Sequence, residues 1–170
     1  MAEIIKAYRH KGGAVRFIGK QYHDCDRVNG TFGAKWGEWF ENRWFDLIRK
    51  QFDENMTDML EDGNAEIGLM RGNRTPGNPF EYWIGIFTPE GTAVPQGFDF
   101  IDFRHESIGV CWVRGQENDV YMHEPECCDR LKEEGFQIDA PWCFERYVPS
   151  RFERPDENGN IVLDICFFVK

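Results

Sequence analysis

One carboxylate near the end of the chain lies among large rings. Glu145 belongs to the run Trp142-Cys143-Phe144-Glu145-Arg146-Tyr147, whose composition is typical of a strand. Successive strand side chains point to opposite faces, so Glu145 shares its face with Tyr147, and Trp142 and Phe144 point the other way. A charge in such surroundings is costly unless something compensates it. The compensating group is either an Arg or Lys of the protein or a cationic ligand that binds and leaves.

Aromatic residues are abundant for a chain of this length. The 170 residues include 15 Phe, 6 Trp and 5 Tyr, and the formal net charge at pH 7 is -10. Rings beyond those that a core needs suit a stacking pocket. The negative charge argues against broad contact with the phosphates of nucleic acids. We therefore expect cations, and no nucleic acid, as partners.

The composition also bounds the class of protein. The length fits one domain. The sequence shows neither a signal-peptide core nor the roughly 18 consecutive apolar residues of a membrane helix. Its six cysteines form no C-x-x-C pair, so we expect reduced cysteines and no zinc site. We predict a soluble, cytoplasmic domain of residues 1–170 with no metal, no cofactor and no membrane contact.

Hydrophobic periodicity predicts the elements that must position these residues. Strands are expected at residues 4–9, 14–22, 65–71, 81–88, 98–103, 107–114, 142–148 and 161–169, and helices at 31–52 and 118–134. Pro125 indicates that the second helix either starts there or is kinked, and Gly135 ends it. On one continuous first helix, Trp36 and Phe40 lie on the apolar half, whereas Trp39 lies among polar residues. Trp39 therefore needs another partner, either a neighbouring element or a ligand.

The order of these elements is strand-helix-strand-strand, repeated once, with an additional strand at the margin of each half. We place the halves at about residues 1–90 and 98–170. Helices that alternate with antiparallel hairpins indicate an α+β fold. We predict a tandem βαββ duplication, in which an antiparallel sheet carries two helices on one face with a ligand groove between them.

Glycines recur inside the predicted strands. Ile-Gly pairs occupy residues 18–19, 67–68, 84–85 and 108–109. Glycine within a strand often marks a place where another group approaches the backbone closely. That group is either a packed helix, the more common reason, or a ligand.

Several segments keep an order and spacing that resemble a known family. They are Glu81-Tyr82-Trp83-Ile84-Gly85-Ile86-Phe87, Pro95-Gln96-Gly97-Phe98, Ile108-Gly109-Val110-Cys111-Trp112-Val113, Phe144-Glu145-Arg146-Tyr147 and Ile161-Val162-Leu163-Asp164-Ile165. Together they resemble the GyrI-like family, the effector-binding domains of AraC-type and MerR-type multidrug regulators. The match covers most of residues 65–170, and the helix with Trp36 and Phe40 fits the family's first helix.

The resemblance implies a tandem βαββ fold that binds lipophilic, often cationic, aromatic compounds around a central acidic residue. Glu145 occupies the matching position. The walls that we predict from the first helix and the sheet are Trp36, Phe40, Trp39 at the rim, Tyr82, Trp112 and Tyr147. No helix-turn-helix fits ahead of Ile4 or after Lys170, so we expect a stand-alone sensor or sequestering domain.

Two alternatives use the same features. The resemblance also implies a catalytic alternative, in which some GyrI-like proteins hydrolyse strained, cyclopropane-containing electrophiles. Glu145, with a pKa that burial raises, would then be the general base, and Tyr147 would donate to the substrate carbonyl. A protein-interaction inhibitor of DNA gyrase is the third reading, which scattered charges disfavour. We favour binding over catalysis, because the histidines and the missing G-x-S-x-G elbow supply no other catalytic set.

Overall fold

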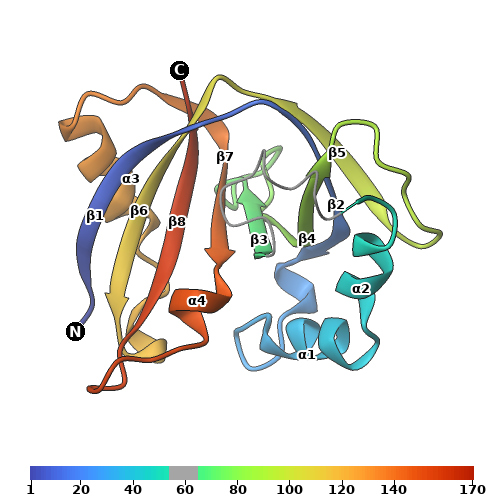
Figure 1. Ribbon diagram of the computed structural model, residues 1–170, viewed down its shortest axis with the longest axis horizontal. Helices are drawn as coiled ribbons and strands as arrows, with labels where there is room; N and C mark the ends of the chain where they lie inside the picture. Colours follow the sequence, from blue (N-terminus) through green and yellow to red (C-terminus); the bar gives the residue numbers. More distant parts are fainter. Residues whose placement is uncertain (54–64) are drawn as a thin grey trace. The chain divides into compact units, whose positions relative to one another are not determined.

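The computed structural model describes residues 1–53 and 65–170. They form two compact units, each of which is described by itself. Unit 1 consists of Met1–Gly13 and Arg104–Lys170, and unit 2 consists of Ala14–Phe103. Each unit is an antiparallel sheet with helices packed against it, which confirms the predicted α+β class (Figure 1).

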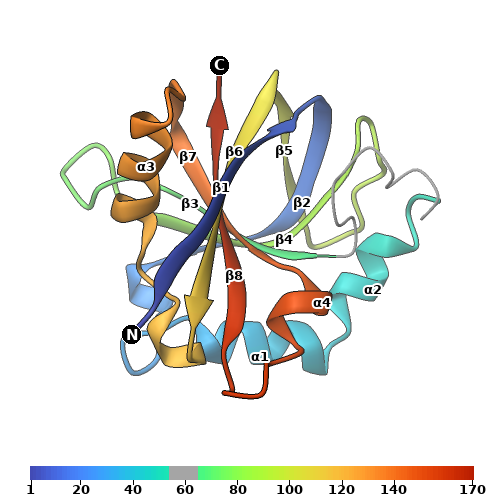
Figure 2. The ribbon, with the colours of Figure 1, turned by 60° about the vertical axis from the view of Figure 1, so that its left-hand side comes forward.

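Unit 1 is built on four strands in the order β1-β6-β8-β7. These are β1 (Glu3–Lys11), β6 (Ser107–Gly115), β7 (Ile138–Tyr147) and β8 (Ile161–Val169). The helix α3 (Glu124–Glu133) packs against all four strands, and the short α4 (Pro149–Phe152) follows β7 (Figures 1 and 2). Pro125 lies in the first turn of α3, and Gly135 follows its end with a φ of +87°. The helix therefore starts at the proline and is not kinked there.

Unit 2 repeats this plan with strands in the order β3-β4-β2-β5. These are β2 (Ala14–His23), β3 (Glu66–Arg71), β4 (Glu81–Pro89) and β5 (Asp99–Arg104). Two short helices, α1 (Gly33–Glu41) and α2 (Trp44–Arg49), follow one another between β2 and β3 (Figure 2). Side chains of α1 bond to β2 and β4, so these helices cover one face of the unit 2 sheet.

The two units share one connectivity. One repeat is β2, α1 with α2, β3 and β4, and the other is β6, α3, β7 and β8. The edge strand β5 pairs with β2, and the edge strand β1 pairs with β6. This confirms the predicted tandem βαββ duplication. The first strand, which the sequence groups with residues 1–90, completes the sheet of the other unit, with Glu3 opposite Arg114.

The single helix predicted over residues 31–52 is wrong. Arg43 adopts the left-handed conformation, with φ 54° and ψ 38°, and separates α1 from α2. The side-chain amide of Asn42 donates to the backbone oxygen of Glu38 at 2.8 Å and so closes the last turn of α1. A left-handed residue is a common way for an α-helix to end. The periodicity of one continuous helix therefore does not extend past Arg43.

The strand glycines leave room for protein groups. A Cβ atom on Gly109 would lie 3.1 Å from the side chain of Leu131 in α3. A Cβ atom on Gly19 would lie 2.3 Å from the backbone oxygen of Ile84. Gly109 thus lets a helix approach the sheet, and Gly19 lets a neighbouring strand approach. At these two positions the protein itself explains the glycine.

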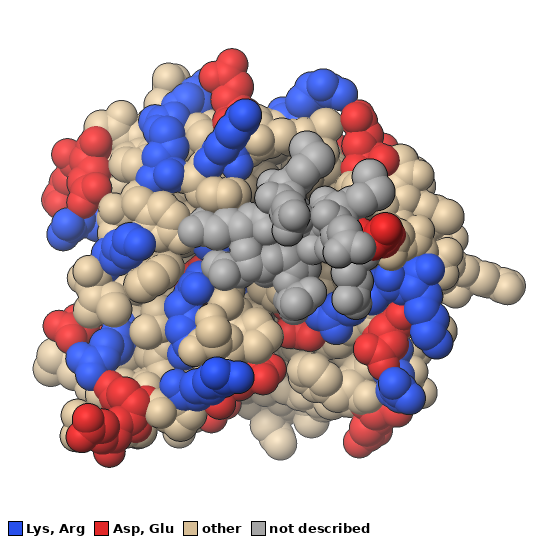
Figure 3. Space-filling model, viewed as in Figure 1, with Lys and Arg blue, Asp and Glu red and all other residues tan. Residues whose placement is uncertain are grey.

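The surface carries charges of both signs. On the face shown in Figure 3, acidic and basic side chains are interspersed. Within residues 1–53 and 65–170, no helix is long and apolar enough to cross a membrane.

Candidate functional site

The register of unit 1 determines which side chains share a face with Glu145. Glu145 pairs with Ile165, and Ile165 pairs with Cys111. Directly opposed residues of antiparallel strands point to the same face. The Cys111 thiol lies 3.6 Å from the backbone oxygen of Cys127 in α3. Glu145 therefore points to the face of the sheet that α3 covers.

Glu145 and Tyr147 form a hydrogen-bonded pair on this face. Glu145 is 7% exposed. The hydroxyl of Tyr147 donates to its Oε2 at 2.8 Å. The Tyr147 ring packs edge-on against Phe152 of α4, with ring centroids 4.8 Å apart, which fixes the direction of the hydroxyl. A neutral donor stabilises a carboxylate without removing its charge. The structure thus brings together the two residues that strand alternation places on one face.

The Tyr121 hydroxyl and the Cys143 thiol both interact electrostatically with Glu145. Burial, with the negative charges of Glu117 and Glu145, raises the pKa of Tyr121 to about 12. Burial, with the charges of Glu124 and Glu145 among others, raises the pKa of Cys143 to about 12. Both groups are therefore neutral at pH 7. Their shifts indicate a region of low dielectric constant and negative potential.

Trp112 lies on the opposite face from Glu145. It pairs with Asp164, and Asp164 pairs with Arg146, so these three side chains share the face away from α3. The Trp112 ring stands at 89° to that of Tyr8, with centroids 6.1 Å apart. Its Nε1 is buried and has no hydrogen-bond partner within the described part of the chain. The sheet therefore does not bring Trp112 to the Glu145 side chain.

Three of the predicted wall residues lie together in unit 2. Nε1 of Trp36 donates to the hydroxyl of Tyr82 at 3.1 Å. Phe40 stacks on Trp36 with centroids 6.3 Å apart, and it is 58% exposed. Phe32 stacks on Tyr82 with centroids 4.3 Å apart and planes 2° apart, so it covers one face of the Tyr82 ring. Phe40 and Trp36 thus offer more ring surface than Tyr82 does.

Phe32 is a member of this cluster that the sequence reasoning misses. It precedes Trp36 by four residues, as Trp36 precedes Phe40. Residues four apart are neighbours on one face of a helix. The spacing of the three rings was therefore the signal that could have found it.

Trp39 is a core residue. Its side chain is 0% exposed, and its Nε1 donates to the hydroxyl of Tyr22 in β2 at 3.0 Å. Its ring also contacts Trp44 and Phe45 of α2, with centroids 5.5 and 4.6 Å away. Of the two partners that the sequence leaves open for Trp39, the neighbouring element is the one observed.

No family model and no curated protein matches the sequence. Solved structures, in contrast, match almost the whole chain. The structure of SAV2435 bound to tetraphenylphosphonium has a TM-score of 0.62 at 13% identity, over 98% of this chain and 94% of that one. The EcmrR C-terminal domain has a TM-score of 0.56 at 9% identity, over 97% of each chain. A hydrolase from Listeria innocua has a TM-score of 0.57 at 10% identity, over 97% of this chain and 92% of that one.

The chain has the GyrI-like fold. These neighbours confirm the fold that the sequence resemblance implies. At such low identity a likeness establishes the fold alone. The chemistry of this chain must therefore be argued from its own side chains.

The chemistry that these residues offer is that of a buried negative charge beside hydroxyls and rings. Within residues 1–53 and 65–170, no group of three or more His, Cys, Asp or Glu side chains is placed to hold a metal ion. The sequence does not point to Tyr121, because the helix predicted at residues 118–134 begins only at Glu124, and Tyr121 lies in the irregular connection 116–123 before it. The predicted helical periodicity is therefore wrong at this residue. Tyr121 is related to the Glu145 site by its packing against the same buried cluster as Tyr147.

Proposed function

We propose that this chain binds lipophilic organic cations with aromatic surface, and that Glu145 compensates their positive charge. The observation that carries the proposal is a carboxylate that is 7% exposed and hydrogen-bonded by a neutral hydroxyl. A carboxylate and a cation about 4 Å apart gain roughly 4 kcal/mol at an effective dielectric constant near 20, before desolvation. The electrostatic part of binding therefore needs no oriented hydrogen bond from the ligand, which favours a broad range of ligands.

The aromatic residues of unit 2 are a separate part of the proposal. Contacts of a cation with the faces of Trp or Tyr contribute about 0.5–2 kcal/mol each. Phe40 is more than half exposed and rests on Trp36, so its ring is held without being covered. Trp36, Phe40 and Tyr82 are the ring contacts that we propose.

The neighbouring structures support this proposal by analogy. SAV2435 was solved with tetraphenylphosphonium, a lipophilic cation that carries phenyl rings. The same ligand is a suitable probe for the present chain. A multidrug sensor or a protein that sequesters such compounds is the role that this binding would serve.

A titration of tetraphenylphosphonium into three proteins tests the proposal. In Glu145→Gln the carboxylate becomes a neutral amide of nearly equal shape, and we expect about 10- to 100-fold weaker binding. Glu133→Gln removes the same charge from an exposed position on α3 and should bind like the unchanged protein. Equal affinity of the Glu145→Gln variant and the unchanged protein would remove the electrostatic part of the proposal.

Hydrolysis of strained electrophiles is the second candidate. The 2.8 Å bond between Tyr147 and Glu145 favours it, because a carboxylate beside a hydroxyl supplies a general base and a hydrogen-bond donor. In this scheme the Tyr147 hydroxyl turns from Glu145 to donate to the substrate carbonyl. Glu145 takes a proton from the water whose oxygen attacks the strained ring, and the ring carbon that leaves takes up a proton. The neighbour described as a hydrolase from Listeria innocua supports the candidate. Multiple turnovers of a cyclopropane-containing electrophile would support catalysis, and stoichiometric binding without turnover would leave binding as the function.

A further inference from the structure

Tyr121 lies at the same end of unit 1 as Glu145 and Tyr147. The strands β6 and β7 both run antiparallel to β8, and both end near its start: Gly115 pairs with Ile161, and Arg146 pairs with Asp164. Figure 1 shows the arrowheads of β6 and β7 pointing to the same end of this unit. The connection 116–123 leaves that end and leads into α3. Tyr121 is therefore on the side of the sheet that α3 covers.

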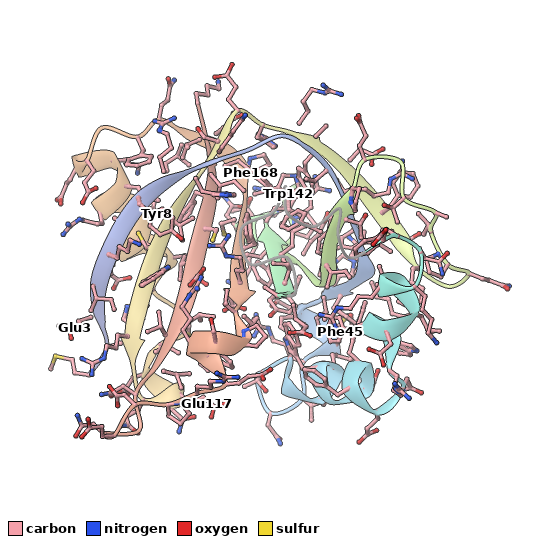
Figure 4. The ribbon with its side chains drawn as sticks, in the orientation of Figure 1. Glu3, Tyr8, Phe45, Glu117, Trp142 and Phe168 are labelled. Atoms are coloured by element: carbon pink, nitrogen blue, oxygen red, sulfur yellow. The ribbon has the colours of Figure 1, made fainter. Side chains whose placement is uncertain are left out.

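The packing of Tyr121 agrees with this placement. Tyr121 and Tyr147 both pack, partly buried, against one buried cluster that includes Val120, Cys127 and Leu163. Glu117, labelled in Figure 4, lies just beyond the end of β6 and four residues before Tyr121. The charge of Glu145 acts on the Tyr121 hydroxyl strongly enough to contribute to its raised pKa. The hydroxyl is thus neutral, and it is a hydrogen-bond donor at neutral pH.

The two tyrosine hydroxyls differ in what they bind. The hydroxyl of Tyr147 donates to Glu145. The hydroxyl of Tyr121 forms no hydrogen bond with any residue of the ranges 1–53 and 65–170. It is also not among the fully buried polar atoms without a partner, so it retains contact with solvent. Tyr121 therefore holds a donor that a ligand can use on the same side and at the same end of the unit 1 sheet as the buried carboxylate.

We propose that Tyr121 is a specificity residue of the Glu145 site, whose hydroxyl donates a hydrogen bond to an acceptor atom of the bound cation. This inference rests on the proposed function. The carboxylate attracts any lipophilic cation, and Tyr121 selects among them. Cations that carry a carbonyl or a similar acceptor bind more tightly than cations of the same shape without one.

A matched pair of ligands separates the selectivity that we assign to Tyr121 from the electrostatic attraction that we assign to Glu145. (4-Acetylphenyl)triphenylphosphonium and (4-isopropenylphenyl)triphenylphosphonium have the same charge and nearly the same shape, because a C=O group replaces a C=CH2 group. We expect the unchanged protein to bind the acetyl compound about two- to tenfold more tightly, as one net hydrogen bond allows. In Tyr121→Phe the two affinities should become equal, while the affinity for the isopropenyl compound stays the same. In Tyr147→Phe both affinities should fall together and keep their ratio.

The outcomes distinguish this inference from the proposed function. Equal affinity of the unchanged protein for both ligands would overturn the role of Tyr121 and leave cation binding intact. A preference for the acetyl compound that survives in Tyr121→Phe would also overturn it. Failure of the unchanged protein to bind either cation would overturn the proposed function itself, and the inference with it.

Discussion

Each face of the β7–β8 strand pair carries a buried carboxylate, and the two carboxylates accept hydrogen bonds from different kinds of donor. On the face away from α3, Asp164 is 0% exposed and accepts from Nε of Arg146 at 2.8 Å and from Nε of Arg151 at 2.7 Å. On the face that α3 covers, Glu145 is 7% exposed and accepts from the neutral hydroxyl of Tyr147 at 2.8 Å. The first carboxylate accepts hydrogen bonds from guanidinium groups that are permanently charged, and Glu145 accepts one from a hydroxyl that carries no charge.

The ion pair of Asp164 is structural, whereas we propose that Glu145 on the other face binds a ligand. A buried ion pair holds its partners in place, and loss of one partner leaves the other charges buried and uncompensated. A neutral hydroxyl stabilises a carboxylate without removing its charge. Burial raises the pKa of Tyr121 and of Cys143, and the charge of Glu145 contributes to both shifts. Strand alternation, together with the register that pairs Arg146 with Asp164, puts the two carboxylates on opposite faces of adjacent strands. Substitutions on each face test this contrast.

Asp164→Asn should give the largest loss of stability. The substitution leaves the buried Arg146 and the partly buried Arg151 beside a neutral amide, so we expect the free energy of unfolding to fall by about 3–5 kcal/mol in a urea titration. Asp129→Asn removes the same charge from an exposed ion pair with Lys132 and should change stability by less than about 0.5 kcal/mol. Similar small changes in both variants would show that the Asp164 network is not structural.

Tyr147→Phe should have the next largest effect. It removes a hydrogen bond to a buried carboxylate, and such bonds are worth about 1.5–3 kcal/mol. Tyr8→Phe is the control from the other face, since it removes a long 3.4 Å contact with Arg146 and should cost less. Urea unfolding measures both losses. If Tyr8→Phe costs as much as Tyr147→Phe, the hydroxyl of Tyr147 has no special place beside Glu145.

Glu145→Gln should leave the stability unchanged or raise it by up to about 1 kcal/mol. An amide of the same shape no longer carries the desolvation cost of a buried charge, and functional sites often gain stability when their charge is removed. The same urea titration measures the change. A loss as large as that of Asp164→Asn would mean that Glu145 belongs to the structural framework and is not reserved for a ligand.

Asp156→Asn, which changes a surface carboxylate, should affect stability least, and only at acidic pH. A hydrogen bond from Arg114, with others from the backbone of Asn160 and Asn158, lowers the pKa of Asp156 in the turn between β7 and β8. A lowered pKa stabilises the fold above the unfolded value of about 4, and this stability is lost as pH falls through the folded value. Asp156→Asn should therefore lose less stability than the unchanged protein between neutral pH and pH 2.

Thermal unfolding at several pH values measures this difference. Glu157→Gln, at the exposed next position in the same turn, is the matched control and should follow the unchanged protein. An acid profile of Asp156→Asn that matches the profile of the unchanged protein would show that the turn does not contribute.

Most of the fold could be predicted from the sequence, because residue patterns give the bounds of its strands closely. The strand predicted at residues 161–169 is observed as β8 (Ile161–Val169), and the strand predicted at 107–114 as β6 (Ser107–Gly115). The alternation of side chains along a strand also places Glu145 and Tyr147 on one face, and this prediction needs only the two-residue period of a strand. The start of α3 at Pro125 follows from the missing backbone N–H of proline.

The parts that the sequence conceals depend on contacts far along the chain. Alternation separates Trp112 from Cys111, but only the register of β6 with β8 tells which of them shares the face of Glu145. The break after α1 occurs at Arg43, whose residue type gives no signal for a left-handed conformation. Tyr121 falls within the helix predicted at residues 118–134 but lies in the irregular connection before Glu124, so the predicted periodicity could not relate it to Glu145.

The most direct test of the central claim compares two ligands of equal shape and opposite charge. Tetraphenylphosphonium and tetraphenylborate differ in the sign of their charge, and the ratio of their affinities isolates the electrostatic contribution of the site. We predict that the unchanged protein and Glu133→Gln prefer the phosphonium, and that Glu145→Gln reduces this preference at least about tenfold. An unchanged ratio in Glu145→Gln would contradict the claim that this carboxylate is kept for a cationic ligand.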